Sequence, residues 1–198
     1  IFYAGFGASV KRCPQGAFTI CTRFHTMDQI LHKMMKESDN LYAESMYYQI
    51  AASTGNRPAS AKSARNVERQ LIRKIGLDPA RYKLADGSGL SLYNYLSAEL
   101  EVMMLRYAFR NDNIKQHLIH SLPIAGVDGT LKKRMRSGSA HGNVKAKTGT
   151  LTGIISLAGY CTAANGHELC FSIINNGIMH GSNARNFADK VCKLLCQP

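Results

Sequence analysis

The stretch VKAKTGTLTGIISLAGY, at residues 144–160, does most to decide the fold. It contains two strand-like runs, at about 144–150 and 153–162. The dipeptide Asn165-Gly166 follows and is typical of a tight hairpin turn, because both residues tolerate the positive φ angles that such turns need. A third strand-like run, 168–175, comes next. The sequence therefore predicts an antiparallel three-stranded meander.

Outside this meander the apolar residues recur with the spacing of amphipathic helices. Thr26 and Gln29 resemble a capping box at the start of the first helix, and the triplet Ser38-Asp39-Asn40 separates it from the second. The remaining expected helices cover residues 60–75, 92–109, 113–121 and 183–196. We therefore expect an α+β protein, with a helical part at 25–121 and the strands and final helix at 122–198.

The composition is that of a folded and strongly basic chain. Its 198 residues include 25 Lys and Arg against 13 Asp and Glu, which gives a formal charge of +12, and 45% of them are hydrophobic. These values exclude a disordered chain, and no apolar run is long enough for a transmembrane helix. The charge itself is compatible with a nucleic-acid partner or with an acidic substrate.

The basic residues include a cluster between Gly129 and His167, a stretch without any acidic residue. Nucleic-acid binding would favour aromatic residues interleaved with these cations, but none occurs between Phe109 and Tyr160. The sequence contains neither a helix-turn-helix signature nor a zinc-binding Cys-x-x-Cys pair. We therefore expect no nucleic-acid partner, no metal and no cofactor, and we interpret the charge as a solvated basic face.

Six cysteines leave the disulfide state open. If Asn165-Gly166 form a two-residue turn, counting back along both strands places Cys161 opposite Cys170. Cross-strand neighbours of this kind are close enough either for a disulfide or for two packed, buried thiols. Cys192 and Cys196 lie one helical turn apart, and we expect packed thiols there.

Two short motifs carry the chemistry. Ser38-Asp39-Asn40 lies between two expected helices, and Lys147-Thr148-Gly149-Thr150 lies on an expected strand, where Gly149 lets another backbone approach closely. Taken alone, the first motif is typical of a helix cap and the second of a solvated strand end. In this order, with a helical region between them, they resemble the serine acyl-transfer enzymes that process penicillins and D-alanyl peptides.

The residue types suit acyl transfer on a peptide. The Ser38 hydroxyl can relay a proton to a leaving amine, and the Asn40 carboxamide can donate a hydrogen bond to a substrate carbonyl. Lys147 can hold positive charge near an anionic substrate, whose terminal carboxylate would meet the hydroxyls of Thr148 and Thr150. A peptide can also pair with the backbone of this strand by β-augmentation.

Four segments resemble one family of enzymes: MMKESDNLYAE (34–44), DGSGLS (86–91), LPIAGVDGTLKKR (122–134) and the stretch at 144–160. The family is that of the D-alanyl-D-alanine carboxypeptidases/endopeptidases, the class C low-molecular-mass penicillin-binding proteins, and the resemblance covers residues 25–196. It implies a bacterial periplasmic serine-type peptidase that trims or cleaves peptidoglycan stem peptides and binds β-lactams. It also implies a transpeptidase-like fold, shared with β-lactamases, in which helices sandwich an antiparallel sheet beside a helical lobe.

The resemblance also implies a role for each candidate residue. The catalytic residues would be Ser38, Asn40 and Lys147, and the substrate-binding residues would be Thr148, Gly149 and Thr150. In the family, this second group grips the substrate carboxylate beside the lysine. The backbone N–H of Thr150 would form half of the oxyanion hole.

The family's nucleophile is missing from this chain. In the family it comes from a Ser-x-x-Lys motif upstream of Ser38, and here no lysine has a serine three residues before it. We therefore expect the C-terminal half of such an enzyme, inactive alone, with residues 1–24 matching the family poorly. Its partner would be the missing N-terminal half, and the apolar face left exposed would favour self-association.

Two alternative functions remain open. A serine β-lactamase-like hydrolase shares both motifs, although the segment LPIAGVDGTL (122–131) favours the peptidase. A degenerate or truncated, non-catalytic module that binds cell-wall peptides would need no nucleophile of its own.

Overall fold

The computed structural model describes residues 14–55 and 58–197. Its strands, β1 (Lys145–Leu151), β2 (Ile154–Thr162) and β3 (Glu168–Asn176), form an antiparallel sheet in the order β1-β2-β3. The predicted meander is therefore confirmed, with boundaries close to those expected from the sequence.

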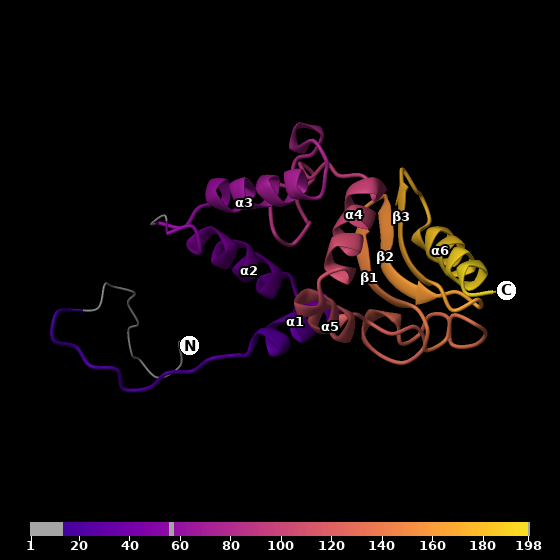
Figure 1. Cartoon of the computed structure of the whole chain (residues 1–198), viewed down its shortest axis with the longest axis horizontal. Coiled ribbons are helices and arrows are strands. Elements are labelled where there is room, and N and C mark those ends of the chain that lie inside the picture. The colour runs from indigo at the N-terminus through magenta and orange to yellow at the C-terminus, as the bar shows by residue number, and fades with distance from the viewer. Residues whose placement is uncertain (1–13, 56–57, 198) are drawn as a thin grey trace.

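Helices cover the two faces of this sheet (Figure 1). The last helix, α6 (Gly181–Leu195), packs on the face that carries Leu157 and Cys161 of β2. On the opposite face lies α4 (Ala98–Phe109), and the Tyr160 hydroxyl of β2 donates to a backbone carbonyl of this helix at 2.8 Å. Because side chains alternate along a strand, neighbouring residues of β2 serve the two layers in turn.

The other helices form a part that extends away from the sheet (Figure 1). They are α1 (Met27–Lys36), α2 (Asn40–Ala52), α3 (Ala61–Lys74) and α5 (Asp112–Ser121), with the short 3-10 turn η1 (Pro79–Arg81). A second 3-10 turn, η2 (Gly129–Leu131), packs instead against β1, and its Leu131 lies in the core between α6 and the sheet. Thr26 and Gln29 form the predicted capping box of α1. α2 and α3 pack against each other, while α1 packs on α5 nearer the sheet. Residues 14–24 form no helix or strand, and the earlier part of the unassigned segment 1–24 lies outside the described residues.

The helix expected at 92–109 is shorter than predicted, because α4 begins only at Ala98. Residues 92–97 belong instead to a loop in which the Asp86 carboxylate accepts three hydrogen bonds. These come from the backbone N–H groups of Gly89 and Ser91 (2.8 and 2.7 Å) and from the Asn94 side chain (2.8 Å). Hydrogen bonds from side chains to nearby backbone compete with helix formation, so the prediction for this segment was wrong.

The hairpin between β2 and β3 also differs from the prediction. The N–H of Ala163 donates to the carbonyl of His167 (2.9 Å), so the turn has three residues and ends at Gly166, with φ 82°. Cys161 and Cys170 are therefore one position out of register and lie on opposite faces of the sheet. The predicted position of Cys161 opposite Cys170 was therefore wrong, and of the two states left open both residues are free thiols.

The prediction for the other two cysteines is confirmed. Cys192 and Cys196 of the α6 region are buried free thiols, packed with Cys161 in the core between α6 and the sheet. Burial raises the pKa values of Cys161 and Cys192 to about 12, because a thiolate is poorly solvated there. These thiols therefore act as small apolar side chains.

Candidate active site

Ser38 lies in the short connection between α1 and α2. Asp39 caps α2 by accepting hydrogen bonds from the backbone N–H groups of Leu41 and Tyr42 (3.0 and 3.1 Å), and Asn40 is the first residue of the helix. Ser38 itself adopts φ 58°, in the left-handed region that residues other than glycine rarely occupy. This conformation costs about 1–2 kcal/mol, so the packing around the connection must hold it in place.

The Lys147 ammonium joins the two motifs. Its Nζ donates to Ser38 Oγ (2.7 Å), across 109 residues of sequence, and to the Thr148 carbonyl oxygen (2.7 Å). Burial lowers the pKa of Lys147, because desolvation disfavours the charged form. Since the ammonium donates to Ser38 Oγ, the hydroxyl hydrogen of Ser38 remains available to donate to another group.

Both motifs border a cleft of about 660 Å³. All six residues predicted for the site line it: Ser38, Asn40, Lys147, Thr148, Gly149 and Thr150. Further lining residues come from the loop at 88–96 and from β2 and β3. The structure therefore brings together every residue that the sequence predicted for the site.

The Lys-Thr-Gly residues lie on an edge strand. In the described part of the chain, β1 pairs with a neighbouring strand only on its β2 side, apart from an isolated bridge at Lys145. Gly149 lies opposite Ser156, and a Cβ at this position would collide with the Ser156 hydroxyl. A larger residue at position 149 would therefore have to displace the Ser156 side chain. The Thr148 hydroxyl lies 2.9 Å from that of Thr130, which also borders the cleft.

A buried ion pair lies beside the Ser38 connection. Lys36, the last residue of α1, is 6% exposed, and its Nζ lies 2.5 Å from Asp128 Oδ2. The other oxygen of this carboxylate accepts from the N–H of Ile124 (2.8 Å). Gly129 packs so closely that a Cβ there would lie 2.8 Å from the Lys36 carbonyl oxygen. The sequence did not indicate this pair, because neither residue carries a local signal for a partner far along the chain.

The turn at residues 86–91 docks directly on α2. A Cβ at Gly87 would lie 2.6 Å from Tyr47 Cβ and 2.7 Å from a backbone oxygen of α2, so only glycine fits without movement. The N–H of Ser88 also donates to Glu44 Oε1 of α2 (2.9 Å). The glycine-rich sequence indicated the turn, but nothing in it indicated the contact with Glu44. One wall of the cleft is thus fixed to the helix that starts at the Ser-x-Asn motif.

One carboxylate is among the residues that line the cleft. Glu101 on α4 accepts a hydrogen bond from the Ser172 hydroxyl of β3 at 2.6 Å. Burial raises the pKa of Glu101, and the hydrogen bond from Ser172 opposes that rise. Across residues 14–55 and 58–197, no group of three or more His, Cys, Asp or Glu side chains is arranged to hold a metal ion. Sequence analysis missed Glu101, since an acidic residue in the first turn of a helix is ordinary.

Comparison with known proteins assigns the chain to a family. The D-Ala-D-Ala carboxypeptidase 3 (S13) family matches residues 14–197. The chain belongs to this family. It is 38% identical over 157 residues to the D-alanyl-D-alanine carboxypeptidase DacB of Haemophilus influenzae, which covers 78% of this chain and 33% of the relative. This S13 chain therefore spans about a third of that relative, and the matched part is the relative's C-terminal portion.

Solved structures with the same fold include a penicillin-binding protein and a β-lactamase. The crystal structure of penicillin binding protein 4 (dacB) from Haemophilus influenzae superposes with a TM-score of 0.74 and 35% identity, covering 83% of this chain and 39% of that one. The TLA-3 extended-spectrum β-lactamase gives a TM-score of 0.59 at 16% identity, over 87% of this chain and 62% of that one, which shows likeness of fold alone. The predicted α+β fold, a part of the transpeptidase and β-lactamase architecture, is confirmed.

Proposed function

We propose that this chain forms the Ser-x-Asn and Lys-Thr-Gly side of the active site of a serine-type D-Ala-D-Ala carboxypeptidase/endopeptidase. The enzyme would act on peptidoglycan stem peptides and bind β-lactams in the bacterial periplasm. Membership of the S13 family supports the reaction class. The observation that carries the proposal is the 2.7 Å hydrogen bond from Lys147 Nζ to Ser38 Oγ, which brings the two motifs to one cleft.

Ser38 is the proposed proton relay. In acyl transfer from a peptide, the leaving amine must gain a proton as the carbon–nitrogen bond breaks. The Lys147 ammonium occupies a lone pair of Ser38 Oγ, so the Ser38 hydroxyl can donate its hydrogen to that amine. The lowered pKa of Lys147 then favours replacement of the donated proton by the ammonium. Asn40, at the start of α2, would orient the peptide by donating to a substrate carbonyl.

The edge of β1 is the proposed binding site for the end of the peptide. An extended substrate can add to this strand by β-augmentation, because its outer backbone groups face the cleft side of the sheet. The Thr148 and Thr150 hydroxyls would donate to the terminal carboxylate, beside the positive charge of Lys147. Gly149 keeps the strand close to Ser156, and the N–H of Thr150 would contribute to the oxyanion hole.

The nucleophile of the proposed reaction must come from outside this sequence. No serine lies three residues before a lysine here, so acylation needs a Ser-x-x-Lys motif on another segment. The cleft carries apolar side chains suited to packing such a segment, and Leu90, Leu92 and Tyr95 are 51%, 75% and 61% exposed. We expect the N-terminal half of a complete enzyme to cover them, and the chain to self-associate through them when alone.

The location follows from the same proposal. Peptidoglycan and its stem peptides lie outside the bacterial cytoplasm, so the enzyme would work in the periplasm. In the part of the chain that the structure describes, no helix has the length and apolarity needed to span a membrane.

A fluorescent penicillin tests the proposal. The chain alone should form no covalent adduct, by mass spectrometry, because it lacks the nucleophile. A chimera in which this chain replaces the matching portion of Haemophilus influenzae DacB should be acylated on the serine of the DacB part. In that chimera, Lys147→Ala and Ser38→Ala should each slow acylation by about 10²-fold or more.

Lys132→Ala provides the matched control, because it also removes a cation and lies outside the residues that line the cleft. It should leave the acylation rate unchanged. An adduct on the chain alone, or full acylation of the Lys147→Ala chimera, would contradict the proposal. A folded chimera that binds D-Ala-D-Ala peptides but never forms an adduct would favour the non-catalytic binding module instead.

A further inference from the structure

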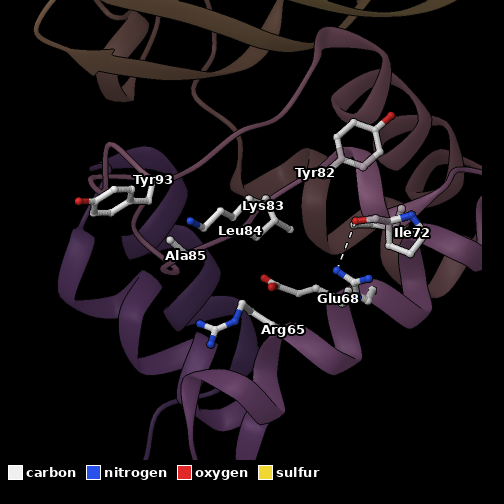
Figure 2. Close-up of a pocket in the computed structure, with 10 residues that line it drawn as sticks. Arg65, Glu68, Ile72, Tyr82, Lys83, Leu84, Ala85 and Tyr93 are labelled. Carbon is white, nitrogen blue, oxygen red and sulfur yellow. Dashed lines mark hydrogen bonds between the residues drawn. The ribbon is translucent and has the colours of Figure 1, made fainter.

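A second cavity lies between α3 and the segment 79–93, apart from the cleft (Figure 2). We call it the α3 pocket, and its volume is about 390 Å³. It shares no lining residue with the cleft. Its lining includes Arg65, Glu68 and Arg69 of α3 and Lys83, Leu84 and Tyr93 of the following segment. None of them belongs to the motifs of the proposed active site.

Glu68 is the central polar group of the α3 pocket. Its Oε2 atom is buried and has no hydrogen-bond partner among the residues that the structure describes. Figure 2 shows its carboxylate pointing toward the side of the pocket where Arg65, Lys83 and Ala85 lie. Burial raises the pKa of Glu68 to about 7, and the charge of Arg65 only partly opposes this rise. A buried acceptor without a donor is rare in proteins and needs an explanation.

Three cations line the same pocket as this carboxylate. Within the described residues, no ion pair shorter than 4 Å joins Glu68 to Arg65, Arg69 or Lys83. Arg69 donates instead to the Pro79 carbonyl oxygen at 3.5 Å. The Nζ of Lys83 lies over the Tyr93 ring, 5.1 Å from its centre. Arg65 shares a side-chain hydrogen bond with Tyr47, but its guanidinium has further N–H groups. The pocket therefore holds an acceptor without a partner among the described residues, beside cations that can still donate.

The charges select the kind of ligand that fits. A simple anion would meet Arg65 and Lys83 but would be repelled by the Glu68 carboxylate, and a simple amine would be repelled by the cations. A zwitterion matches both, because its ammonium can donate to Glu68 while its carboxylate accepts from the cations. The apolar walls, which include Leu84 and the face of Tyr93, leave space for a small side chain.

We propose that the α3 pocket is a second ligand site, which takes an amino acid or the end of a short peptide as a zwitterion. The ammonium group binds Glu68, and the carboxylate group binds Arg65 and Lys83. The volume of about 390 Å³ accommodates a ligand of this size. This site is independent of the proposed function, because it uses no residue of the cleft.

Titration of the chain with alanine, acetate and ethylamine, followed by NMR shifts of labelled tyrosines, tests this site. Alanine should shift Tyr93, with at least about tenfold tighter binding than either acetate or ethylamine, because only alanine satisfies both kinds of charge. Glu68→Gln should weaken alanine binding by about tenfold and at the same time strengthen acetate binding. This opposite change is a signature that loss of folding cannot produce.

Two control variants sharpen the test. Arg65→Ala should abolish alanine binding, whereas Arg73→Ala, which removes an exposed cation of the same helix outside the pocket, should not. Glu37→Gln removes an exposed carboxylate elsewhere and should also leave binding unchanged. The site would be refuted if alanine fails to bind, if acetate binds as tightly as alanine, or if Glu68→Gln binds alanine like the original chain. A failure here would leave the penicillin result on the cleft untouched.

Discussion

The cleft and the α3 pocket each hold a half-buried ionisable side chain, but the surroundings of the two differ. Lys147 in the cleft has two oxygen partners at 2.7 Å, while Glu68 in the pocket has an oxygen without a partner among the described residues. Burial favours the neutral form of both, lowering the pKa of Lys147 and raising that of Glu68 to about 7. Lys147, which already has hydrogen-bond partners, is held in position before any substrate binds. Glu68 lacks such a partner for one oxygen, which fits a site where a ligand supplies the missing donor.

The largest effect on stability should come from the ion pair of Lys36 and Asp128 beside the cleft. Asp128→Ala leaves the Lys36 ammonium buried without its partner, and we expect it to lower the free energy of unfolding by roughly 2–3 kcal/mol. The Asp128 side chain is 39% exposed, so the loss should stay below that of a fully buried pair. Urea denaturation measures it. Glu37→Ala, which breaks the exposed pair with Lys33, should lower stability far less because water screens that pair, and equal losses in the two variants would contradict the assigned role.

The next effect concerns the loop that borders both cavities. Gly87→Ala places a methyl group against Tyr47 and the backbone of α2, and it should cost about 1–3 kcal/mol because one of the two must move. The neighbouring change Ser88→Ala keeps the backbone N–H that binds Glu44, so it should stay within about 0.5 kcal/mol. Thermal or urea unfolding compares the two. Equal stability of the Gly87→Ala variant would show that the turn does not depend on its contact with α2.

A smaller effect should appear at Glu68 and depend on pH. Its pKa is near 4.5 when unfolded and about 7 when folded, so the folded chain binds the extra proton between these values. Stability from this group is therefore full below about pH 4.5 and falls as the pH rises toward 7. Glu68→Gln removes that loss and should be more stable by about 1 kcal/mol at pH 8, after allowance for solvent screening, with no gain at pH 4. A gain that is equal at both pH values would contradict the raised pKa.

The smallest effect on stability should appear at Lys147, and its dependence on pH should be opposite to that of Glu68. The pKa of Lys147 is lower in the folded than in the unfolded chain, so folding releases a proton and stability rises as the pH approaches 10.5. Lys147→Met should change stability by less than about 1 kcal/mol at pH 7, because the lost hydrogen bonds and the removed desolvation cost oppose each other. The stability of the variant relative to the original chain should then fall with rising pH. A flat difference in urea denaturation curves would contradict this assignment.

The residues that the sequence predicted for the site all line one cleft, because they form two short motifs. Ser38 directly precedes Asp39, which caps α2, and Lys147 lies on the first strand of the meander, so local rules place each of them. The ion pair of Lys36 and Asp128 joins residues 92 positions apart, and such pairing is set by tertiary packing alone. The helix start at Ala98 was predicted too early because hydrogen bonds to Asp86 prevail over helical periodicity.

The remaining errors and omissions have equally definite causes. The hairpin register was wrong by one residue because Asn165-Gly166 belongs to a three-residue turn, and a shift of one position reverses the face of every side chain. The α3 pocket was not predicted at all. Arg65 and Glu68 lie on a helix rich in charged residues, which is typical of a solvated face. Only the segment that folds back over α3 turns that face into a cavity wall.

The loop held by Asp86 constrains which amino-acid substitutions this protein can accept during evolution. Ala85 and Tyr93 of this loop line the α3 pocket, while Ser88, Leu90 and Tyr95 line the cleft. The same loop thus separates the cleft from the α3 pocket, and the hydrogen bonds of the Asp86 carboxylate hold the loop in place. Substitutions in this loop that adapt one cavity must be compatible with the other. Libraries of variants selected for one binding specificity should therefore carry correlated changes on both sides of the loop.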